Sequence, residues 1–136
     1  MSETTVPASG TVTGGVRILL RLEGLTLFGG MVLLYWMWGG SWWLFVILFF
    51  APDLGFVAYL SDARTGAIIY NAAHSYMAPV ALLTTGFATG EPLTLSLAMI
   101  WLAHIGFDRA LGYGLKYQTG FGFTHLGLIG KSSKAA

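Results

Sequence analysis

Two histidines and two aspartates lie in stretches of sequence that are otherwise apolar. His104 and Asp108 are four residues apart in "WLAHIGFDRALGYGLKY", so they share one helix face about one turn apart. Asp53 and His74 occur in two earlier apolar stretches. Imidazole and carboxylate groups are ligands of divalent cations, and water on such a cation becomes a nucleophile. We therefore expect all four residues to bind one divalent metal, Zn, Mn or Mg, in a site capable of hydrolysis.

The remaining polar candidates are assigned by similar reasoning. Glu23 and Asp53 are candidate catalytic carboxylates, with Glu23 acting as a general base or as a partner of a metal ligand. His125, in "FTHLG", closes the site if the C-terminal segment folds back. Cationic and amide groups at the same depth suit an anionic head group, and the candidate substrate-binding residues are Asn71, Arg109 and Lys116.

The composition is typical of a membrane protein. Of the 136 residues, 55% are hydrophobic and 10% are charged, against about 25% charged in an ordinary soluble domain. Four apolar stretches are each about long enough to cross the hydrocarbon core as a helix, and short turn-like links separate them. The sequence therefore predicts an all-α integral membrane protein, a four-helix antiparallel transmembrane bundle with spans at roughly 16–38, 41–60, 66–87 and 93–115.

The positions of lysine and arginine predict the orientation of this bundle. All seven lie towards one face, and the cytoplasmic side of a membrane protein is the side rich in them. We expect a multi-pass protein of the bacterial inner membrane with both termini in the cytoplasm. Its parts are a flexible N-terminal tail at 1–15, a four-helix domain at 16–115 and a cytoplasmic C-terminal tail at 116–136.

With this orientation, the polar residues fall between about 9 and 16 Å from the cytoplasmic ends of their helices. A charge near the bilayer centre costs at least about 2.5–3.5 kcal/mol, so such residues normally turn inward and pair. Pro52 and Pro79 are each expected to kink a helix close to this level. We predict a polar chamber in the cytoplasmic half to which every helix contributes, formed by Glu23, Asp53, Asn71, His74, His104 and Asp108.

Structural roles account for several of these residues equally well. His104 with Asp108 suits a hydrogen bond between helices, and Asn71 suits helix packing. Glu23 has possible ion-pair partners in Arg17, Arg21 and Arg109. Under this interpretation His125 is a surface residue.

Two further functions remain open at this point. The same titratable groups suit proton or ion movement by a homo-oligomer, since histidine titrates near physiological pH. A structural subunit of a larger membrane complex needs them only to hold helices together. Membrane lipids are expected partners in every case, whereas a net charge of +1 without a basic stripe excludes nucleic acid. The absence of cysteine excludes disulfides and thiolate metal sites.

Five motifs carry a resemblance to a known family. In order and spacing, "LLRLEG", "APDLG", "YNAAHSYMAP", "WLAHIGFDRALGYGLKY" and "GFGFTHLG" resemble the small bacterial membrane family known as domain of unknown function 4260. A weaker similarity is to the membrane-bound metal-dependent hydrolases, in which Asp53, His104 and Asp108 match motif positions and His74 matches loosely. Gly55 stands where that pattern has a second aspartate. This second resemblance implies metal-dependent hydrolysis.

Overall fold

The computed structural model describes residues 10–117 and 122–129. The N-terminal tail expected at 1–15 and the C-terminal tail expected at 116–136 therefore lie partly outside the described residues. A helical chain ends in a small antiparallel hairpin. Its elements are α1 (Gly14–Trp38), α2 (Trp42–Phe49), the 3₁₀-helix η1 (Ala51–Leu60), α3 (Ala63–His74), α4 (Met77–Thr89), α5 (Pro92–Leu111), β1 (Phe123–Thr124) and β2 (Gly127–Leu128).

Local sequence signals set the ends of these helices. The Asp62 carboxylate accepts a hydrogen bond from the backbone N–H of Thr65 at 2.8 Å and begins α3. The Glu91 carboxylate caps α5 in the same way, through the N–H of Thr94 at 2.7 Å. Three helices end at a residue with positive φ, where glycine is the residue without a steric penalty: Gly39, Gly90 and Gly112.

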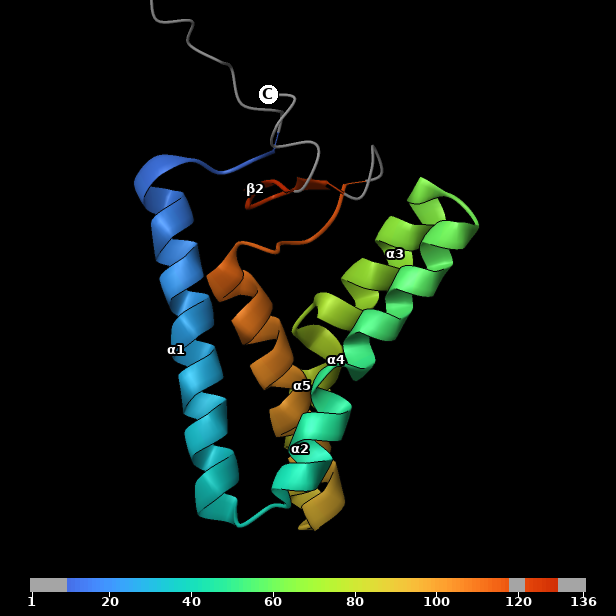
Figure 1. Cartoon of the computed structure of the whole chain (residues 1–136). Coiled ribbons are helices and arrows are strands. Elements are labelled where there is room, and N and C mark those ends of the chain that lie inside the picture. Colours follow the sequence, from blue (N-terminus) through green and yellow to red (C-terminus); the bar gives the residue numbers. More distant parts are fainter. Residues whose placement is uncertain (1–9, 118–121, 130–136) are drawn as a thin grey trace, which may run out of the picture.

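α5 packs against α1, α2 and α4, whereas η1 and α3 pack mainly against each other (Figure 1). α1 runs along α5, while η1 and α3 form an antiparallel pair, and α2 and α4 pack on α5. A close approach joins α1 to α5, because a Cβ on Gly24 would lie 2.8 Å from the carbonyl oxygen of Gly106. The core beside this contact consists of Tyr35, Phe45, Phe49, Leu95, Met99, Ile100 and Ala103.

The stretch expected as one span at 66–87 is two helices. α3 ends at His74, the backbone of Ser75 is extended, and α4 begins at Met77. Pro79 gives the physical reason, since its ring would meet the carbonyl of Ser75 in a continuous helix and its nitrogen has no hydrogen to donate there. With 12 and 13 residues, α3 and α4 are each shorter than the roughly 20 residues that a span needs.

The second apolar stretch also changes geometry at a proline. α2 ends at Phe49, and the chain continues as a 3₁₀-helix that carries Pro52 in its first turn. The Pro52 nitrogen cannot donate the hydrogen bond of an α-helical turn, so the expected irregularity appears here as a change of helix type.

Two helices in the described part of the chain are long and apolar enough to cross a membrane. They are Gly14–Trp38 and Trp42–Leu60, the latter formed by α2 with η1. The core helix of a soluble protein is mostly buried, whereas here Trp43, Ile47 and Leu60 are 79%, 70% and 87% exposed. Exposed apolar helices of this length suggest a membrane protein.

The described ends of the chain meet at one end of the helices. The backbone N–H of Val12 donates to the carbonyl oxygen of His125 at 2.9 Å. The backbones of Lys116 and Thr124 form an isolated antiparallel β-bridge. The chain therefore turns back after α5, and the β1–β2 hairpin lies near the start of α1 (Figure 1). The expected fold-back of the segment that carries His125 is therefore present.

Candidate metal centre

Four of the residues singled out in the sequence meet at one point. Asp53 comes from η1, His74 is the last residue of α3, and His104 and Asp108 come from α5. One ligand atom from each of the four lies within 4.8 Å of all the others. Among the described residues, this group of carboxylates and imidazoles could hold a metal ion.

Five of the six distances between these ligand atoms are nearly equal. His74 Nε2 lies 3.1 Å from His104 Nε2, 3.4 Å from Asp53 Oδ1 and 3.3 Å from Asp108 Oδ2. His104 Nε2 lies 3.3 Å from Asp53 Oδ1 and 3.2 Å from Asp108 Oδ2. Four ligands at about 2.0–2.1 Å from one zinc ion are about 3.3–3.4 Å apart, because the edge of a tetrahedron is about 1.63 times its centre-to-corner distance. These five distances therefore have the length expected between neighbouring ligands of one ion, and the sixth pair, Asp53 with Asp108, lies within 4.8 Å.

The imidazole of His74 is oriented as metal-binding histidines usually are. Its Nδ1 lies 2.9 Å from the carbonyl oxygen of Tyr70 and donates to it, which leaves the Nε2 lone pair facing the other ligand atoms. The Tyr70 ring also stacks on the imidazole, with centroids 3.8 Å apart and planes inclined by 10°. The imidazole of His104 is held by packing instead, with its ring against Phe49 at 5.3 Å.

Asp53 reaches the site because η1 and α3 advance at the same rate. Three residues of a 3₁₀-helix and four residues of an α-helix each rise about 6 Å. On the facing sides, Asp53 therefore meets His74, and Phe56 stacks on Tyr70 with centroids 5.2 Å apart. Tyr59 lies against Gly66, where any Cβ would overlap the tyrosine ring. The change to 3₁₀ geometry thus places the carboxylate in register with the histidine.

Comparison with known proteins assigns a family. The model of the domain of unknown function DUF4260 matches residues 17–129 of the chain, which include all four ligand candidates. The chain belongs to this family. Neither the curated proteins nor the solved structures contain a match to it.

The break after α3 leaves backbone carbonyl groups next to the candidate metal centre that two α5 side chains bind. The last carbonyl groups of a helix have no partner within that helix. Trp101 Nε1 donates to the carbonyl oxygen of Ala73 at 2.6 Å, and Arg109 Nη2 donates to that of His74 at 3.1 Å. A guanidinium group at a helix C-terminus also interacts favourably with the helix dipole. Both bonds fix the end of α3 and, with it, the position of His74.

The three candidate substrate-binding residues lie near the candidate metal centre, and each already has contacts within the protein. Asn71 donates to the Lys116 carbonyl at 2.8 Å and accepts from the Lys116 N–H at 2.6 Å, which is the packing role considered above. Arg109 is buried at 9% exposure, and its guanidinium lies over the Tyr76 ring. Lys116 is 3% exposed, with Nζ 4.8 Å from the centre of the Tyr70 ring.

His125 lies next to the site without joining the group of four. Its Nδ1 accepts from the N–H of Leu115 at 2.9 Å, and its Nε2 lies 3.0 Å from Arg109 Nη1. Burial and the neighbouring guanidinium lower the pKa of His125 and favour the neutral ring. His125 therefore connects the C-terminal hairpin to Arg109, and through Arg109 to the end of α3.

Glu23 is placed apart from the other candidates. It lies on an exposed face of α1 and is not one of the four clustered residues. The expectation that every helix contributes to one polar chamber is wrong for α1, because its inward face at this level is Gly24, packed against Gly106. That close contact turns the neighbouring Glu23 outward.

Proposed function

We propose that this protein is an integral membrane metalloprotein, in which Asp53, His74, His104 and Asp108 bind one divalent cation and support hydrolysis of a lipid-linked or phosphate-bearing substrate. The observation that carries the metal assignment is the set of ligand-atom separations between 3.1 and 3.4 Å. A donor set of two imidazole nitrogens and two carboxylate oxygens favours zinc over manganese or magnesium, which prefer octahedral oxygen ligands.

The exposure of the ligands supports a role beyond structure. The side chain of Asp53 is 29% exposed, against 13% for Asp108 and 3% or less for the two histidines. Water and substrate therefore have their approach on the Asp53 side. A bound zinc ion lowers the pKa of water to about 7 and can expand to five ligands, so four protein ligands do not prevent this chemistry.

In this proposal the remaining residues have defined tasks. Asp53, the most exposed carboxylate, accepts the proton of the attacking water, whose oxygen forms a bond to the phosphorus or carbonyl carbon as the leaving oxygen departs. Arg109 and Lys116 place positive charge next to the centre and stabilise an anionic head group. Asn71 acts by positioning Lys116, because its side-chain amide forms hydrogen bonds with both the backbone carbonyl and the backbone N–H of that residue.

The exposed apolar helices and the positions of the basic residues support a location in the membrane. We assign the chain to the inner membrane as a multi-pass protein with both termini in the cytoplasm, since Arg17 and Arg21 lie in the first two turns of α1, and Arg64 lies in the first turn of α3. Trp36, Trp38, Trp42 and Trp43 are exposed around the opposite link, as expected for side chains at a membrane interface.

Metal analysis of the detergent-purified protein tests the proposal. After incubation with zinc and removal of excess ion, we expect one ion per chain and loss of that ion in His104→Ala. The matched control is His125→Ala, which removes the histidine outside the group and should retain zinc. The matched carboxylate variants are Asp53→Asn and Glu23→Gln. Asp53→Asn should bind zinc at least about tenfold more weakly than the parent protein, whereas Glu23→Gln should bind zinc with unchanged affinity. Equal zinc content in His104→Ala and the parent protein contradicts the assignment.

Proton movement is a second candidate, supported by the same short distances. A proton shared between His74 and His104 at 3.1 Å, with two carboxylates beside it, is the chemistry of an intramembrane relay. A pathway across the membrane then requires an assembly of several copies. Reconstituted liposomes separate the two functions, because a relay dissipates an imposed pH gradient and a hydrolase does not.

A further inference from the structure

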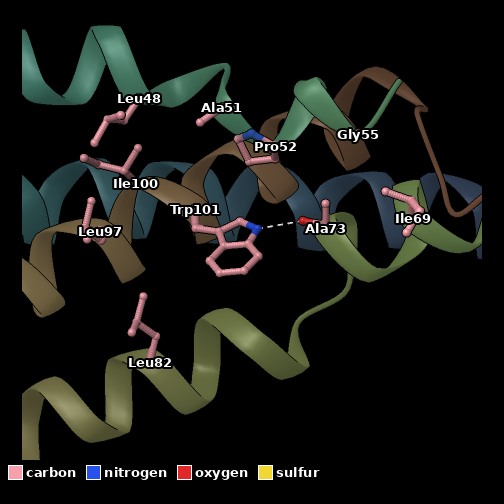
Figure 2. A pocket seen from close by; sticks show the side chains of 10 residues that line it. All are labelled: Leu48, Ala51, Pro52, Gly55, Ile69, Ala73, Leu82, Leu97, Ile100 and Trp101. Carbon is pink, nitrogen blue, oxygen red and sulfur yellow. Dashed lines mark hydrogen bonds between the residues drawn. The ribbon is translucent and has the colours of Figure 1, made fainter. Parts of the chain in front are cut away.

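An apolar groove of about 490 Å³ lies between the η1–α3 pair and the helices α4 and α5. Figure 2 shows Trp101 in the middle of this groove, between Leu97 on one side and Ile69 on the other. The indole N–H is already donated to the Ala73 carbonyl at 2.6 Å, so the groove meets the apolar part of the ring. All the residues that line the groove are apolar. A volume of this size falls within the range of small-molecule sites, about 300–1,000 Å³.

The groove opens beside a segment whose exposed surface is apolar. One wall comes from Trp42–Leu60, one of the two helices apolar enough to cross a membrane. Ile47, Leu54 and Val57 of the same segment are 70%, 73% and 63% exposed. In the proposed membrane location, the medium at this opening consists of acyl chains rather than water.

The groove is also continuous with the candidate metal centre along three segments. Pro52 lines the groove and precedes Asp53, while Ala73 lines it and precedes His74. Trp101 lines the groove one helical turn before His104. A ligand with its apolar part in the groove therefore has its polar end close to the four metal ligands, on the side where Asp53 is exposed.

We propose that this groove binds one acyl chain of an anionic membrane lipid next to the metal centre, and so makes a lipid the substrate class of the proposed hydrolysis. The apolar groove and the neighbouring cations together favour a lipid with an acyl chain and an anionic head group. The groove offers only apolar contact, and the cations Arg109 and Lys116 stand beside the centre. The chain outside the described residues is a poor alternative, because the segments 1–9 and 130–136 are rich in polar residues. Only the substrate role rests on the proposed function, whereas acyl-chain binding requires no metal.

Trp101 provides a direct probe of the groove. Replacing the other four tryptophans (Trp36→Phe, Trp38→Phe, Trp42→Phe and Trp43→Phe) leaves Trp101 as the single tryptophan of the full-length chain, whose fluorescence can be excited selectively. In detergent micelles, phosphatidylglycerol with brominated acyl chains should quench this fluorescence saturably, because bromine quenches only at short range.

Matched variants on α5 separate groove binding from general contact with the micelle. Leu97→Phe adds a ring to a groove-lining residue, and we expect about tenfold weaker binding of the brominated lipid. Leu93→Phe makes the same change one turn earlier, at an exposed residue outside the groove, and should leave binding unchanged. Leu82→Phe, on the α4 wall, should weaken binding as Leu97→Phe does.

The outcomes distinguish this inference from the metal assignment. Quenching that does not saturate, or that is equal in Leu97→Phe and Leu93→Phe, overturns the lipid groove. A change of oligomeric state in Leu97→Phe without a change in lipid binding also overturns it, because the groove is then a contact between copies. Zinc content is measured on the same samples: loss of saturable quenching with zinc retained rejects the groove alone, and saturable quenching without zinc rejects the metal centre alone.

Discussion

The Nε2 atoms of His74 and His104 face each other at 3.1 Å, although the two residues belong to different helices. Two imidazole nitrogens at this distance must share a proton or a cation, because two lone pairs or two N–H groups repel. The Nδ1 proton of His74 is committed to the Tyr70 carbonyl, so the Nε2 lone pair of His74 is available to the shared ion. Tyr70 therefore orients the His74 imidazole, through its carbonyl and its ring, so that Nε2 faces His104.

Replacement of the Tyr70 ring should weaken metal binding while the four ligands remain. Tyr70→Leu removes the stacked ring that orients His74, and we expect a roughly 10–100-fold loss of zinc affinity, typical of residues that orient a ligand. Tyr70→Phe keeps the ring and should retain affinity within about threefold. Competition with a chromophoric chelator measures both, and circular dichroism verifies the fold. Equal affinity in Tyr70→Leu and the parent protein would show that the stack has no part in orienting the ligand.

A single methyl group should disturb the contact between α1 and α5. In Gly24→Ala the new Cβ would lie 2.8 Å from the Gly106 carbonyl oxygen and 2.9 Å from the Ala110 nitrogen, both backbone atoms. We expect a loss of about 1–3 kcal/mol in unfolding free energy, as in other overpacked sites. Gly29→Ala is the matched control in the same helix, because its Cβ meets nothing within 4 Å. It should stabilise by about 0.5–1 kcal/mol through helix propensity. Unfolding of both variants in mixed micelles gives the comparison, and equal effects would contradict the close approach.

The sequence was sufficient to predict that Asp53, His74, His104 and Asp108 lie together, for a physical reason. His104 and Asp108 share a helix face by spacing, and an apolar environment requires buried polar groups to find partners. That requirement also applies to Asp53 and His74, which the sequence places at a similar depth to the α5 pair. Convergence was therefore predictable without knowledge of how the helices cross.

Helix rotation and helix breaks were not predictable in the same way. α1 is apolar around most of its circumference, so its sequence pattern does not show that Gly24 faces inward and Glu23 outward. Pro79 in an apolar run indicates a kink, but the complete break at Ser75 depends on Trp101 and Arg109, which satisfy the freed carbonyls from another helix. Pro52 likewise indicates an irregular helix, but the contact of Phe56 in η1 with Tyr70 in α3 joins two segments whose pairing the sequence pattern does not show.

The burial of Lys116 should appear as a rise of stability with pH. Desolvation lowers the pKa of Lys116 from 10.5 to about 8, since the charged ammonium is disfavoured away from water. Between these two values the unfolded chain binds more protons than the folded chain, so the free energy of unfolding increases as the pH rises through that window. Below about pH 8 the penalty is present in full and constant. Unfolding measured across the window should show the rise in the parent protein and a smaller one in Lys116→Met. The same slope in both proteins would assign the effect to other groups.

Cysteine labelling tests the proposed orientation, because the chain contains no cysteine of its own. Ala63 begins α3 beside Arg64, and Ala88 lies near the end of α4, and both residues are exposed. The two alanines give matched variants, Ala63→Cys and Ala88→Cys. With both termini in the cytoplasm, a membrane-impermeant maleimide should label Ala88→Cys in intact cells and Ala63→Cys only after permeabilisation.

Because the third apolar segment is broken into α3 and α4, this labelling also tests whether the two helices cross the membrane together. α3 and α4 are separately too short to cross about 30 Å of hydrocarbon, so they reach opposite faces only if the pair crosses as one unit, with the break at Ser75 buried against α5. The bonds from Trp101 and Arg109 to the freed carbonyls provide that burial. Labelling of both cysteines in intact cells would mean that α3 and α4 return to the same face, and the metal site would then lie on a re-entrant segment. Labelling of Ala63→Cys alone would reverse the orientation and leave the crossing intact.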